Sequence, residues 1–160
     1  MDNIIVYTDG ACKSNPGKGG WSCLIQPTES EYTYILYGSV DNTTNNRMEM
    51  VAVLNSLNYI SLQYGVNSRI KLYTDSKYIE QSINKGWLDK WIESSFKGIK
   101  NVDLWVKIYG YLNKLNIEFE WVRGHDGNTY NELVDYYASM ACEKETKLSS
   151  NIVKRVDIQN

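Results

Sequence analysis

The sequence predicts one α/β domain of the mixed α+β kind, in which a five-stranded sheet is flanked by helices. Short runs of β-branched and aromatic residues alternate with stretches of helical periodicity in the order βββαβα-α-βα. The first three strands have short polar connections, which are typical of antiparallel hairpins, whereas helices separate the later strands. A chain of 160 residues without an internal repeat fits one domain with a hydrophobic core.

The N-terminal third of the chain is predicted to form a three-stranded meander. Residues 4–10 are an apolar run that ends in Asp9 and glycine, the pattern of a buried central strand. The turn-rich stretch 13–20 follows, and then two strands at 21–26 and 32–39. Burying an unpaired carboxylate costs free energy, so Asp9 at the tip of this strand indicates a metal or a cationic partner.

Helices dominate the remaining chain. Apolar residues recur at three- and four-residue spacing from 48 to 64, and Gly65 is a natural stop for this helix. The other expected elements are a strand at 69–74, a short helix at 76–84, an irregular aromatic segment at 85–100, a helix at 102–115, a strand at 117–122, a loop at 123–129 and a helix at 130–145.

The C-terminal residues 147–160 are expected to be a polar, frayed tail after a domain that spans 1–146. Within this tail, residues 152–156 are either a small docking element or a segment without a role.

Composition limits the classes of function. The net charge of −2 and the pI of about 5.5 do not favour nucleic-acid binding through bulk charge, so a local basic patch or metal ions would be needed. The chain shows no apolar run long enough to span a membrane and no signal-peptide pattern. Three cysteines without paired spacing, Cys12, Cys23 and Cys142, fit free thiols in a reducing compartment. We therefore expect a soluble, cytoplasmic monomer.

Four acids are candidate site residues, although each has an ordinary structural interpretation. Asp9 and Asp75 both follow a strand-like run that ends in threonine, so two parallel strands would place them side by side. Alternatively, Asp9 begins a turn and Asp75 caps the helix at 76–84. Glu49 follows Asn46 at the spacing of a capping box, and Asp135 could be a solvated helix residue.

Six blocks of the sequence resemble the type 1 ribonuclease H family, in the family's order and at close to its spacing, from about residue 4 to residue 142. They are Thr8-Asp9-Gly10-Ala11 with Asn15-Pro16-Gly17 and Gly19-Gly20, Thr43-Thr44-Asn45-Asn46-Arg47-Met48-Glu49, Tyr73-Thr74-Asp75-Ser76, Lys100-Asn101-Val102-Asp103-Leu104-Trp105, Trp121-Val122-Arg123-Gly124-His125, and Asn131-Glu132 with Asp135.

The resemblance implies a ribonuclease H-like fold, with three antiparallel strands plus two parallel ones, and a hydrolase that acts on RNA–DNA hybrids. In that family four carboxylates hold two Mg²⁺ ions, which Mn²⁺ can replace, and the RNA strand is cut to leave 5′-phosphates. Here these positions are Asp9, Glu49, Asp75 and Asp135. Carboxylate oxygens suit Mg²⁺, and two such ions suit in-line phosphoryl displacement. His125 would assist the attacking water or product release, although a lone loop histidine is often only solvated.

The resemblance also implies substrate contacts. The amides of Asn15, Asn45 and Asn46 could recognise the RNA 2′-hydroxyl, or they could be turn and cap residues. Further candidates are Thr44 for a DNA-strand phosphate, Lys77 for the backbone, and Trp87 and Trp91 in a handle at 85–100. The two tryptophans could instead be core residues. This handle is only mildly basic, which predicts weak hybrid binding.

Three other kinds of protein are alternatives to a ribonuclease that acts on hybrids. One is a non-catalytic hybrid-binding module with a decayed site, which the presence of all four acids disfavours. Another is a DNA-directed nuclease of the same fold, such as a resolvase or an integrase, which Asn15 and the phrase Thr44-Asn45-Asn46 disfavour. The third is a fragment of a reverse transcriptase, which the initial methionine disfavours. With eight residues before Asp9, no separate N-terminal hybrid-binding domain is expected, and hence no processive action.

Overall fold

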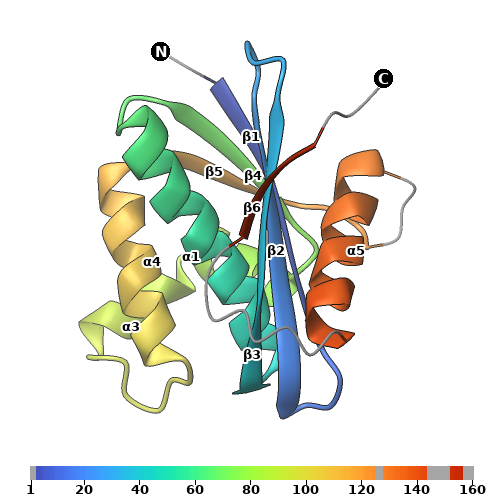
Figure 1. Ribbon diagram of the computed structural model, residues 1–160. Coiled ribbons are helices and arrows are strands. Elements are labelled where there is room, and N and C mark those ends of the chain that lie inside the picture. Colours follow the sequence, from blue (N-terminus) through green and yellow to red (C-terminus); the bar gives the residue numbers. More distant parts are fainter. Residues whose placement is uncertain (1–2, 125–127, 144–151, 157–160) are drawn as a thin grey trace.

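Helices pack against both faces of a mixed β-sheet in this protein (Figure 1). The computed structural model describes residues 3–124, 128–143 and 152–156. Its elements are β1 (Asn3–Cys12), β2 (Gly17–Pro27), β3 (Thr33–Thr43), α1 (Asn45–Tyr64), β4 (Arg69–Thr74), α2 (Lys77–Asn84), α3 (Trp87–Glu93), α4 (Val102–Lys114), β5 (Asn116–Trp121), α5 (Thr129–Glu143) and β6 (Ile152–Val156).

The sheet has the strand order β5-β4-β1-β2-β3-β6. Strands β1, β2 and β3 form the predicted antiparallel meander, and β4 and β5 lie parallel to β1. The mixed five-stranded sheet is therefore confirmed. The sixth strand is an addition, because β6 pairs antiparallel with β3 from Thr33 opposite Val156 to Tyr37 opposite Ile152. Part of the segment expected to be frayed thus extends the sheet.

Two helical layers enclose the sheet (Figure 1). Helix α1 packs on β1, β2 and β3, and α4 packs on α1, so that this side contains most of the core, including the fully buried Trp105. Helix α5 covers the same three strands on the other face, over a smaller cluster that includes Tyr7 and Ile35. No helix in the described ranges is long and apolar enough to cross a membrane.

Strand β3 extends further, and helix α1 begins earlier, than the sequence predicts. Strand β3 continues to Thr43, which pairs with Gly17, although residues 41–43 are polar. Backbone pairing with β2 supplies the hydrogen bonds here, so tertiary context outweighs strand propensity. Helix α1 begins at Asn45 rather than at residue 48, because the Thr44 side chain caps it by accepting a hydrogen bond from the Arg47 amide at 3.2 Å.

Candidate active site

The two Thr-Asp phrases lie side by side. Strands β1 and β4 are parallel, and their register places Thr8 opposite Thr74. Asp9 follows Thr8 within β1, and Asp75 comes directly after the last residue of β4, so the two acids are neighbours. One carboxylate oxygen from each, together with one from Glu49, lies within 4.8 Å of the others. The arrangement expected from the repeated phrase is confirmed.

Glu49 reaches these two acids because α1 packs unusually close to β1. A Cβ atom on Gly10 would lie 2.5 Å from the Glu49 amide nitrogen and 2.6 Å from the carbonyl carbon of Met48. Only glycine allows this approach of helix to strand. Gly10 therefore places the first turns of α1, and with them Glu49, against Asp9.

Asp135 comes from the opposite face, on α5. This helix also lies close to the sheet, since a Cβ on Gly20 would meet the carbonyl oxygen of Ala138 at 2.3 Å. The four acids line one pocket of about 440 Å³. Its other lining residues are Gly10, Asn45, Asn46, Ser76, Lys77 and Tyr78. The structure thus brings together all four acids that the sequence singled out.

Burial and mutual repulsion make the carboxyl groups of Asp9 and Glu49 hard to ionise without a cation. Asp9 is 5% exposed, and burial, followed by the charge of Asp75, raises its pKa to about 8. Burial and then the charge of Asp9 raise the pKa of Glu49 well above its usual value. The Oε2 atom of Glu49 is buried and has no hydrogen-bond partner among the described residues. An oxygen-rich site with an unsatisfied buried carboxylate suits a hard divalent cation.

The ordinary interpretations of three acids are wrong. Strand β1 continues to Cys12, so Asp9 does not begin a turn. The cap of α1 is Thr44 and not Asn46, so Glu49 belongs to no capping box with Asn46. The cap of α2 is Ser76, whose hydroxyl accepts a hydrogen bond from the Ile79 amide at 3.2 Å. Asp75 is therefore not needed as a cap.

The predicted contacts for the 2′-hydroxyl lie at the rim of the pocket or beside it. Asn45 and Asn46 line the pocket. The Asn15 side-chain oxygen accepts a hydrogen bond from the Asn45 amide at 3.2 Å, which ties the turn after β1 to the start of α1. Thr44 acts as the helix cap. His125 lies outside the described residues.

The cationic and aromatic candidates divide into two groups. Lys77 lines the pocket, and its Nζ lies 4.8 Å from the ring centroid of Trp121. Trp87, at the start of α3, is 36% exposed, and the Nζ of Lys85 lies over its ring, 5.6 Å from the ring centroid. Trp91 is half-buried and packs edge-on against the buried Trp105 at 5.6 Å, at the border of the core. Trp91 thus makes the core contact that the alternative interpretation expects, and Trp87 is the more exposed of the two.

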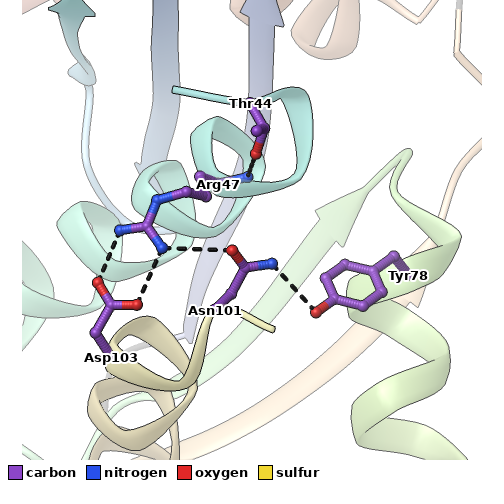
Figure 2. A network of polar contacts seen from close by, with 5 residues as sticks. All are labelled: Thr44, Arg47, Tyr78, Asn101 and Asp103. Carbon is purple, nitrogen blue, oxygen red and sulfur yellow. Dashed lines mark hydrogen bonds and ion pairs between the residues drawn. The ribbon is translucent and has the colours of Figure 1, made fainter. Parts of the chain in front are cut away.

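A polar network that the sequence analysis missed connects three helices beside the pocket (Figure 2). Arg47 forms a bidentate ion pair with Asp103 at 3.0 and 2.7 Å and donates to the Asn101 side-chain oxygen at 3.3 Å. The Asn101 amide donates in turn to the Tyr78 hydroxyl at 3.5 Å. Arg47 lies two residues before Glu49, and Tyr78 three after Asp75. The network therefore joins α1, which carries Glu49, to α2, which follows Asp75.

The Arg47–Asp103 pair gives the first prediction. The Arg47 guanidinium lowers the pKa of Asp103 to about 2 from its usual 3.8. The stabilisation is therefore fully present above about pH 4 and is lost as the pH falls toward 2. Because both side chains are partly exposed, we expect Asp103→Asn to lower the free energy of unfolding by only about 0.5–1 kcal/mol at pH 7.

Urea denaturation at several pH values between 7 and 2 checks this prediction. The matched control is Asp89→Asn, which removes an exposed acid from the first turn of α3 and leaves the network intact. The difference between wild type and Asp103→Asn should shrink below pH 4. An equal loss in both variants would assign the effect to helix-end electrostatics instead of to Arg47.

Comparison with known proteins shows the family of this chain and agrees with its fold. The family model for RNase H matches residues 1–143. The chain belongs to the RNase H family. A ribonuclease H from Trichodesmium erythraeum (strain IMS101) is 43% identical over 146 residues, which cover 88% of this chain and 89% of that relative. A ribonuclease H from Orientia tsutsugamushi (strain Boryong) is 39% identical over 153 residues, covering 92% of this chain and 87% of that relative.

Solved structures of the RNase H family share the fold. LC9-RNase H1, a type 1 RNase H with the type 2 active-site motif, has a TM-score of 0.82 and 28% identity over 95% of this chain and 77% of its own. LC11-RNase H1 in complex with RNA/DNA hybrid has a TM-score of 0.62 at 20% identity, covering 86% of this chain and 98% of that one, and supports the fold alone. The sequence-based assignment to type 1 ribonuclease H is thus confirmed.

Proposed function

We propose that this protein is a metal-dependent endonuclease that hydrolyses the RNA strand of RNA–DNA hybrids and leaves 5′-phosphate ends, with residues 1–146 as its catalytic domain. The observation that carries the proposal is the convergence of Asp9, Glu49, Asp75 and Asp135 on one pocket in a chain of the RNase H family. Curated relatives named ribonuclease H, at about 40% identity, support it.

The four acids are proposed to hold two Mg²⁺ ions, with Mn²⁺ as a possible substitute. Two divalent ions in such a site supply an activated water and stabilise the leaving oxygen of an in-line displacement. The chain's own contribution is to hold the acids close before the ions bind. Because Asp9 and Glu49 have raised pKa values, metal binding must displace protons, so metal affinity should increase with pH up to about 8.

The pocket rim is proposed to recognise the hybrid. Asn45 and Asn46 project from the first turn of α1, where their amides can donate to and accept from a 2′-hydroxyl. Asn15 is proposed to contribute beside them, because its side chain already contacts Asn45. Thr44 and Lys77 are proposed to contact phosphates, and His125 is proposed to assist water attack or product release.

The segment 85–100 is proposed to bind the DNA strand weakly. Lys85 and the exposed Trp87 are adjacent and in contact, which is a suitable surface for a phosphate and its sugar. Because this segment has few uncompensated lysines, the affinity should depend less steeply on salt than that of a strongly basic handle.

Cleavage of a labelled hybrid tests the function. We expect the wild type to cut only the RNA strand of an RNA–DNA hybrid, only with Mg²⁺ or Mn²⁺, and to leave DNA and RNA duplexes of the same sequence intact. Asp75→Asn should lose this activity. Glu118→Gln, which alters an exposed acid on β5, is the matched control and should retain it.

Two results would contradict the proposal. Hybrid binding without cleavage in either metal would indicate a non-catalytic module. Cleavage of DNA duplexes in preference to hybrids would indicate a nuclease of the same fold with another substrate.

A further inference from the structure

Tyr7, on β1, contacts both β4 and the start of α5. These three segments carry or directly precede Asp9, Asp75 and Asp135. Tyr7 is 6% exposed and lies two residues before Asp9 on β1. Its ring stacks on Tyr73 of β4 at 4.7 Å with an interplanar angle of 15°. Tyr73 lies two residues before Asp75. The two rings therefore fix the neighbouring strands just before their acids.

The same tyrosine contacts the start of α5. Its ring lies 5.5 Å from the ring of Tyr130, and its hydroxyl oxygen accepts a hydrogen bond from the Asn128 side-chain amide at 3.2 Å. Asn128 in turn caps α5. Its side-chain oxygen accepts the backbone amides of Tyr130 and Asn131 at 2.9 and 3.1 Å, and its carbonyl accepts the Glu132 amide at 2.9 Å.

Asn128 thus has two separate tasks. Its oxygen satisfies the free amides at the helix start, as many side chains do. Its nitrogen binds Tyr7, which capping does not require.

We propose that Tyr7, through its hydrogen bond to Asn128, is a positioning residue that sets the start of α5 against β1 and β4 and so holds Asp135 in the pocket that it shares with Asp9 and Asp75. Asp135 lies less than two turns after the first residue of α5. A shift or rotation of the helix start would therefore move its carboxylate. The inference rests on the proposed function, because it takes Asp135 to be a metal ligand.

Two substitutions distinguish the Tyr7–Asn128 hydrogen bond from the capping of α5 by Asn128 and from the packing of the Tyr7 ring. Tyr7→Phe keeps the stacked ring and removes only the hydroxyl. Asn128→Ser keeps a capping oxygen and removes the amide donor. The matched control is Tyr37→Phe, because Tyr37 of β3 also packs against α5, through Tyr137 at 5.1 Å, and lies outside the acid pocket.

Calorimetric titration with Mn²⁺ alone, on the full chain without substrate, is the test. We expect Tyr7→Phe and Asn128→Ser each to weaken Mn²⁺ binding roughly 10-fold, the lower end of the effect of outer-shell partners. The double variant should lose no more than either single one, because both remove the same contact. Tyr37→Phe should bind Mn²⁺ like the wild type.

Thermal unfolding of the same samples distinguishes positioning from simple stabilisation. A merely structural role would lower the melting temperature and leave Mn²⁺ affinity unchanged, which would overturn the inference. The inference would also be overturned if Tyr37→Phe weakened Mn²⁺ binding equally. The same holds if the two fold-losses in Mn²⁺ affinity multiplied in the double variant, because the two side chains would then act independently. A wild type that binds no Mn²⁺ would overturn the proposed function itself, a result distinct from these.

Discussion

Asp9→Asn should stop hybrid cleavage while making the metal-free protein more stable. The loss of one central carboxylate removes several kcal/mol of metal-dependent stabilisation of the transition state, which corresponds to a rate decrease on the order of 10³-fold or more. The gain in stability has a separate cause. Asp9 is buried beside two other acids, and an amide at this position carries no charge to desolvate.

The sign of the stability change follows from the pKa. In the folded protein the pKa of Asp9 is about 8, above the ordinary 3.8. The folded state therefore binds this proton more tightly than the unfolded state does. This contribution to stability is fully present below about pH 4 and is lost as the pH rises to about 8. At pH 7 we expect Asp9→Asn to raise the free energy of unfolding by about 2–4 kcal/mol.

Urea denaturation in a chelator between pH 5 and pH 8 checks the stability change. The wild type should become less stable across this window, and Asp9→Asn should show a flatter dependence. Saturating Mg²⁺ should stabilise the wild type and have little effect on the variant. A variant that is less stable than the wild type throughout the window would show that Asp9 is ionised and favourably paired in the metal-free protein.

Gly10→Ala should damage both stability and activity, although it adds a single methyl group. The new Cβ would lie 2.5 Å from the Glu49 amide nitrogen and 2.8 Å from the Met48 Cβ. Since the nearest atoms are backbone atoms of α1, the helix must move away from β1. Overpacking of this kind costs about 1–3 kcal/mol of folding free energy. A displacement of Glu49 by about 1 Å can lower the rate roughly 100-fold.

Gly110→Ala is the matched control for this substitution. Gly110 lies inside α4, and a Cβ there would meet no atom within 4 Å. Alanine should therefore stabilise the protein by about 0.5–1 kcal/mol through helix propensity and leave cleavage unchanged. Thermal unfolding and hybrid cleavage, measured on both variants, provide the comparison. If Gly10→Ala were as stable and as active as the wild type, close contact between α1 and β1 would not be what places Glu49.

Sequence alone determined the first five strands, the helices other than α3 and the four acids, whereas the segment 85–100, expected to be irregular, contains α3. Alternation and helical periodicity are local signals, and the repeated Thr-Asp phrases predicted that Asp9 and Asp75 lie side by side, which the parallel register of β1 and β4 confirms. Asp9 nevertheless lies within β1 and not at its tip, because the strand continues to Cys12. The blocks that resemble ribonuclease H predicted the remaining members of the pocket, Glu49 and Asp135. Each of these predictions depends on residue type and spacing within a short segment.

Only the tertiary structure decided how those segments meet. Arg47 and Asp103 are far apart in the chain, as are Tyr7 and Asn128, so no local pattern reveals either contact. The same reason explains why the contact of Trp91 with Trp105 and the pairing of residues 152–156 with β3 could not be predicted. Residue spacing predicts which side chains lie on one face of a helix or strand. Which residues of other elements they contact depends on how all the elements pack together.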